Sequence, residues 1–163
     1  MPPLTPEWSS FFTAELGALA SLTGFVVVAI SINLTRILAV ASLPGRAAEA
    51  LVAPVGAITA TGLILVPEQS FIVAAAIVAT GLMMVLAPVM IQLRTWDARK
   101  EVAAVERIAR FGASAGFSLT FVIGGALLMA GARSGLVWLA AGDIACIIAV
   151  VLSAWVLMIE ILR

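Results

Sequence analysis

Long apolar runs separated by short polar segments dominate the sequence. A helix rises about 1.5 Å per residue and needs about 20 apolar residues to cross the hydrocarbon core of a bilayer. Five runs are long enough, and they cover residues 11–34, 50–66, 71–93, 111–132 and 136–162. None shows the alternation of apolar and polar residues that a membrane-spanning strand needs. The pattern predicts an all-α fold, a multi-pass bundle of five membrane-spanning helices within a single integral membrane domain, residues 1–163.

Short connections pair these segments. In Val66–Ser70, Pro67 ends one helix and Ser70 is placed to cap the next. Ala132–Gly135 is similarly tight. Because short connections force neighbouring helices to run antiparallel, we expect one hairpin from the second and third segments and another from the fourth and fifth. Residues 42–46 are predicted to form a turn before the second segment.

The basic residues predict an orientation. Eight of the nine Lys and Arg residues fall on one side of the alternating topology, and Arg133 alone falls on the other. Since Lys and Arg concentrate in cytoplasmic loops, the N-terminus is predicted outside and the C-terminus in the cytoplasm of a bacterial-type inner membrane. Five of the eight lie in residues 94–110, a predicted amphipathic connector. It is either a solvated connector at the lipid headgroups or a docking surface for a cytoplasmic protein partner.

Composition supports lipid as the solvent. Hydrophobic residues make up 63% of the chain and charged residues 11%, and mean hydropathy is +1.20. A soluble domain of this size could not bury so much apolar surface. With no His and one Cys, we expect no cofactor, no His/Cys metal site and no Ser-His or Cys-His nucleophile, and thus not an enzyme. The net charge of +0 argues against a nucleic-acid partner.

Polar residues inside the spans are the candidate functional residues, because an ionisable group in lipid costs several kcal/mol. Asp143 is predicted about 12 Å below the outer boundary, with no Lys or Arg at its depth. Hydroxyl residues expected near the same depth are Ser21, Thr23, Thr59, Thr61, Thr80 and Thr120. Of these, Thr59 and Thr120 are predicted to line a polar cavity or ion pathway with Asp143. Alternatively, the hydroxyls bond to carbonyls of their own helices and serve as small packing residues.

Glu15 and Asn33 form a second candidate pair. They are eighteen residues apart, which is about five helical turns, so they share one face of the first segment. Repeated around a symmetry axis, that face would supply an acidic ring, an apolar constriction and an amide ring, the parts of a gated cation pore. Glu68 would add charge to an acidic outer vestibule. Alternatively, Glu15 reaches the interface and Asn33 ends the span.

Two functional hypotheses follow. The first is a small oligomeric membrane protein that acts as a cation channel or a small-solute translocating assembly, with acidic residues at the outer mouth and in the membrane. A homo-oligomer is expected because a thin five-helix bundle would leave Asp143 hard to satisfy. The second is a non-catalytic accessory or scaffold subunit of a larger membrane complex.

Overall fold

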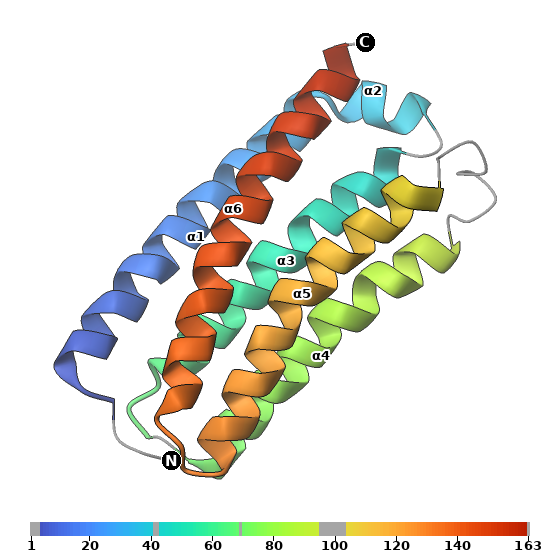
Figure 1. Cartoon of the computed structure of the whole chain (residues 1–163). Helices are drawn as coiled ribbons and strands as arrows, with labels where there is room; N and C mark the ends of the chain where they lie inside the picture. Colours follow the sequence, from blue (N-terminus) through green and yellow to red (C-terminus); the bar gives the residue numbers. More distant parts are fainter. Residues whose placement is uncertain (1–3, 41–42, 69, 95–103, 163) are drawn as a thin grey trace.

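The computed structural model describes residues 4–40, 43–68, 70–94 and 104–162. Within these ranges the chain forms six helices and no strand, which confirms the predicted all-helical fold. The helices are α1 Pro6–Ile32, α2 Leu34–Ala39, α3 Leu43–Ile64, α4 Phe71–Arg94, α5 Ala104–Met129 and α6 Ser134–Leu162. Figure 1 shows the longer helices side by side as a bundle. We call the end that holds the start of α1 and the α5–α6 connection the lower end, and the end that holds α2 the upper end, after their places in Figure 1.

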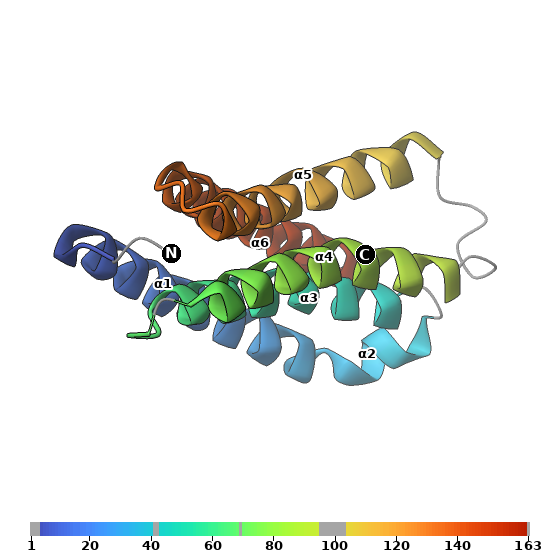
Figure 2. The same ribbon diagram turned by 90° about the horizontal axis from the view of Figure 1, so that it is seen from below.

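The first predicted span forms most of α1, and a second short helix, α2, begins at its end. α1 begins at Pro6, which suits the first turn of a helix because a proline has no N–H that needs a partner, and its last residue, Ile32, is followed by the cap residue Asn33. There the backbone leaves the helical conformation, with φ −103° and ψ 11°, and the Asn33 side chain donates to the carbonyl of Ala29 at 2.9 Å. α2 then runs in a different direction from α1 (Figures 1 and 2). The hydrophobic pattern does not predict this short helix.

The predicted turn before the second span is wrong at residues 43–46, which form the first turn of α3. Pro44 is tolerated there because the first N–H groups of a helix have no intrahelical partner. Leu43 and Ala47 are buried in a small cluster with Ile37 of α2. This tertiary contact favours helix where the local sequence favours a turn, and Ser42 lies outside the described residues.

The predicted connector, residues 94–110, falls partly outside the described residues, which omit 95–103. Residues 104–110 are helical and form the first turns of α5. The fourth predicted span, 111–132, therefore continues a helix that begins at Ala104 and ends at Met129.

The outer surface and the helix lengths are those of a membrane protein. Among the described residues, four helical segments are long and apolar enough to cross a membrane: Pro6–Ile32, Leu43–Ile64, Phe71–Ile91 and Ser134–Trp155. The apolar stretch found in α5, Ala115–Met129, is shorter. Large apolar side chains are exposed around the bundle, as at Phe25 (72% exposed) and Ile72 (77%). Lipid, rather than water, suits such a surface.

Close helix contacts hold the bundle together. α1 packs against α3 and α6, while α5 packs against both α4 and α6. A Cβ placed at Gly81 of α4 would lie 2.9 Å from the backbone nitrogen of Val122 of α5. A Cβ at Gly125 of α5 would lie 3.0 Å from the backbone nitrogen of Val78 of α4. Both glycines therefore allow α4 and α5 to approach backbone to backbone.

Candidate intramembrane carboxyl site

Asp143 is a fully buried acidic residue of α6, with 0% of its surface exposed. Thr61 of α3, itself 2% exposed, donates its hydroxyl to this carboxyl group. The Thr61 Oγ1 lies 2.8 Å from Oδ1 and 2.9 Å from Oδ2 of Asp143. Asp143 is thus hydrogen-bonded within a single chain, so its burial gives no reason to expect an oligomer.

Glu15 of α1 brings a second carboxyl group to the same region. α1 packs against both α3 and α6, and Glu15 is close enough to Asp143 for the two carboxylates to interact electrostatically. The Oε2 atom of Glu15 is buried and has no hydrogen-bond partner among the described residues. Leaving a buried acceptor unpaired costs about 1–3 kcal/mol. We call Glu15, Thr61 and Asp143 the carboxyl site.

The helices around the carboxyl site carry no basic residue at its level. Lys and Arg do not occur in residues 6–35, 47–93, 111–132 or 134–162, and the sequence contains no His. An ion pair with a side chain from these segments is therefore impossible. Negative charge on the site has to be balanced by a proton or a bound cation, because an uncompensated charge in lipid is strongly unfavourable.

The chemistry of the carboxyl site suits a proton or a weakly held cation. A buried carboxyl group can hold a proton, and carboxylate and hydroxyl oxygens also serve as ligands for hard cations. Within the described part of the chain, no group of three or more His, Cys, Asp and Glu side chains is placed to hold a metal ion.

The face of α1 that carries Glu15 and Asn33 packs inside the chain. Leu19 and Val26, which lie on this face, are 0% and 4% exposed. Within one chain this face therefore contacts neighbouring helices, and the stack of an acidic ring, a constriction and an amide ring around a symmetry axis stays a prediction. Glu15 lies within electrostatic range of Asp143 of the same chain, and Asn33 lies eighteen residues away with its side chain bonded to its own helix.

Thr120 and Glu68 are also separate from the carboxyl hydrogen bond. Thr120 of α5 donates to the carbonyl of Phe117 at 2.5 Å. Its hydroxyl lies against the backbone of Gly142, the residue before Asp143, so Thr120 borders the carboxyl site while its hydrogen bond goes to its own helix. Glu68 is exposed in the connection between α3 and α4 at the lower end.

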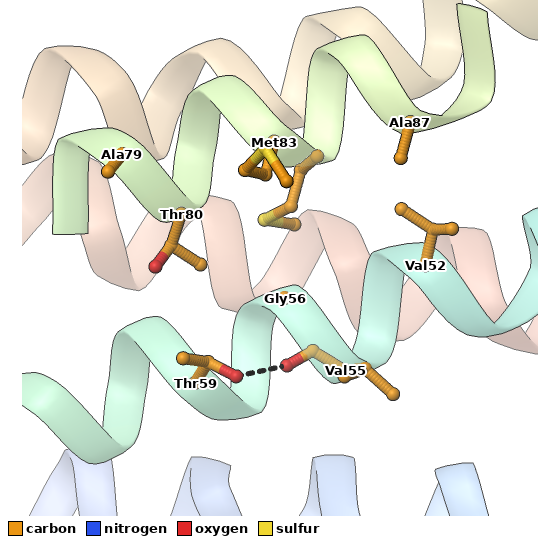
Figure 3. Close-up of a pocket in the computed structure, with 9 residues that line it drawn as sticks. Val52, Val55, Gly56, Thr59, Ala79, Thr80, Met83 and Ala87 are labelled. Atoms are coloured by element: carbon orange, nitrogen blue, oxygen red, sulfur yellow. Dashed lines mark hydrogen bonds between the residues drawn. The ribbon is translucent and has the colours of Figure 1, made fainter. Parts of the chain in front are cut away.

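Thr59 belongs to a different feature, an open groove of about 410 Å³ between α3 and α4. Figure 3 shows Thr59 on one wall and Thr80 on the other. Each hydroxyl donates to a carbonyl of its own helix at 2.8 Å, Thr59 to Val55 and Thr80 to Ala76. The lining residues are otherwise apolar: Val52, Val55, Gly56, Ala79, Met83, Met84 and Ala87. The hydroxyls here serve their own helices, as do those of Ser21 and Thr23.

The expected depth in the membrane does not identify Thr61 as the hydroxyl residue that binds Asp143, because several other Ser and Thr residues are expected near the same depth. Along α3 the residues Pro54, Ala57, Thr61 and Ile64 are spaced by three and four, and all are buried. Thr59 is two positions from Thr61 and points to nearly the opposite side of the helix. The buried stripe of small and apolar residues was the signal that could have identified Thr61 in the sequence.

Comparison of the chain with protein-family models, with curated proteins and with solved structures finds no match.

Proposed function

We propose that this protein moves a proton or a monovalent cation across a membrane by way of the carboxyl site. The observation that carries the proposal is the complete burial of Asp143, with the carboxyl group of Glu15 within electrostatic range, between apolar helices that supply no basic residue. Ionisable groups are costly in lipid, and in membrane proteins they mark ion and proton pathways.

The position of the carboxyl site suggests how passage is controlled. Glu15 and Asp143 each lie nine residues after the first residue of their helix, so both are about 14 Å from the lower end. Between them and the upper end, the buried residues Val26, Cys146 and Val150 form an apolar section of the same helices. A cation entering from the lower end would bind at the carboxyl site, and this apolar section would act as the gate that must hydrate before it can pass.

The proposed topology has five spans, with the lower end outside and the C-terminus in the cytoplasm of a bacterial-type inner membrane. The antiparallel order of α3, α4, α5 and α6 in the bundle supports it, and so does the placement of Arg133 apart from the other basic residues. The formation of a homo-oligomer and the docking of a protein partner at residues 94–110 stay predictions.

The test is a flux assay on the purified full chain reconstituted in liposomes. Proton flux is followed with an entrapped pH dye, and sodium and potassium flux with ion-selective dyes. We expect Asp143→Asn and Glu15→Gln each to lower the flux at least tenfold. Glu7→Gln is the matched control, because Glu7 is an exposed carboxylate in the first turn of the same helix as Glu15.

Three outcomes would count against the proposal. Parental flux in both carboxyl variants would show that the carboxyl site is not on the pathway. Equal loss in Glu7→Gln would point to a general charge effect. An absence of flux in the parent protein would favour the accessory or scaffold function, and co-purification of other chains in mild detergent would support that alternative.

A further inference from the structure

α2 is a six-residue helix with three chemically different sides. Ile37 is 1% exposed and packs with Leu43 and Ala47 of α3. Leu34 and Leu38 are 49% and 65% exposed, and they lie one turn apart on a second side. Arg36 is exposed and lies about 160° around the helix from Leu38, with Ile37 about 100° from each.

This arrangement suits a helix that lies flat at the edge of the bilayer. Such a helix needs one side on the protein, one toward the acyl chains and one toward the headgroups. α2 meets the orientation requirement, since it departs from the direction of α1 at the upper end of the bundle (Figures 1 and 2). With Ile37 fixed against α3, Leu38 can enter the apolar layer while Arg36 reaches the headgroups.

The exposed leucines of α2 continue the lipid-facing surface of α1. Phe25, Val28 and Ile32 are spaced by three and four along the last turns of α1, and they are 72%, 54% and 78% exposed. This stripe ends at Asn33, immediately before Leu34. Because the two exposed surfaces are adjacent in the chain, the lipid that covers the α1 stripe also reaches α2.

We propose that α2 is an interfacial helix that lies in the headgroup layer and binds the phosphate of an anionic lipid through Arg36. The argument rests on continuity with the lipid-facing stripe and on charge complementarity between guanidinium and phosphate. It does not depend on the transport function or on which end of the bundle faces the cytoplasm.

The depth of α2 is tested in the full chain with Cys146→Ser, which removes the single native cysteine. Leu38→Cys and Arg36→Cys then each carry a fluorophore in vesicles that contain phosphatidylglycerol. We expect lipids spin-labelled near the headgroup to quench the label at 38, and aqueous iodide to quench the label at 36 at least threefold more strongly than the label at 38. Equal iodide quenching at both positions, or strong lipid quenching at neither, would overturn the interfacial placement.

The role of Arg36 is tested by lipid selectivity. Arg36→Gln is expected to lower the preference for phosphatidylglycerol over phosphatidylcholine about fivefold, as spin-labelled lipids report. Arg133→Gln is the matched control, since Arg133 is exposed at the opposite end of the bundle. Unchanged selectivity in Arg36→Gln would refute the phosphate contact. Displacement of the lipid by millimolar glycerol phosphate would show that Arg36 holds a soluble anion and would also overturn the proposal.

Discussion

Thr61 of α3 donates its hydroxyl to the carboxyl group of Asp143 of α6, with Oγ1 2.8 Å and 2.9 Å from the two carboxyl oxygens. The bond joins helices whose bonded residues are 82 positions apart in the sequence. Both side chains are buried, and lipid supplies no other hydrogen-bond partner for either of them. The bond therefore fixes the rotation of α3 and α6 relative to each other at the level of the carboxyl site.

Removing the hydroxyl should destabilise the fold. Thr61→Val keeps the shape of the side chain but leaves a buried carboxyl group without its donor, so we expect a loss of about 1–2 kcal/mol. The measurement is the free energy of unfolding in mixed micelles, by SDS titration with circular dichroism.

Thr59→Val supplies the matched control for this loss. Thr59 is exposed on the other side of α3 and bonds only to its own helix, at the carbonyl of Val55. We expect a change within about 0.5 kcal/mol. Equal losses for Thr59→Val and Thr61→Val would mean that the bond to Asp143 contributes nothing beyond the local effect of the substitution.

Glu15→Gln should stabilise the protein while it lowers the proposed cation flux at least tenfold. The Glu15 carboxylate repels Asp143, and its Oε2 lacks a partner among the described residues. An uncharged amide removes the repulsion and can donate to a neighbouring carboxyl oxygen, so we expect a gain of about 1 kcal/mol. The same SDS titration measures it, with Glu68→Gln, at an exposed carboxylate in the connection between α3 and α4, as the reference. A loss of stability would show that the Glu15 charge is compensated in the fold.

The sequence predicted the long helices because each contains a long run of apolar residues, and the helix ends differ from the prediction by up to seven residues. The differences arise where tertiary contacts outweigh the local pattern. α2 and the first turn of α3 depend on the burial of Ile37 against Leu43. Neither α2 nor the first turn of α3 can be predicted from its own segment, because the contact joins two segments.

The acidic members of the carboxyl site could be singled out because ionisable residues are rare in apolar segments. Their grouping could not be predicted, since it depends on which faces of α1, α3 and α6 meet. The hydroxyl and amide residues were harder to interpret. Thr59 and Asn33 satisfy their side chains on their own helices, so depth in the membrane carries no information about their role.

The glycines at the contact between α4 and α5 should be far more sensitive than those of α1. In Gly81→Val the new Cβ would meet the backbone nitrogen of Val122 at 2.9 Å, so the helices must separate, at a cost of about 1–3 kcal/mol. At Gly24 a Cβ meets nothing within 4 Å. We therefore expect Gly24→Ala to stabilise the helix by about 0.5–1 kcal/mol. If Gly81→Val and Gly24→Ala changed the thermal unfolding temperature equally, this would contradict the close approach of α4 and α5.

Cysteine labelling should distinguish the two ends of the bundle and test the proposed orientation. Cys146 is fully buried, so the native protein should not react with a maleimide until SDS unfolds it. In a Cys146→Ser background, Arg133→Cys at the lower end should react with a membrane-impermeant maleimide added to intact right-side-out vesicles. Arg36→Cys at the upper end should react only after the vesicles are permeabilised. The reverse pattern would place the lower end in the cytoplasm and overturn the orientation argued from the basic residues, while leaving the carboxyl site at the same depth from that end.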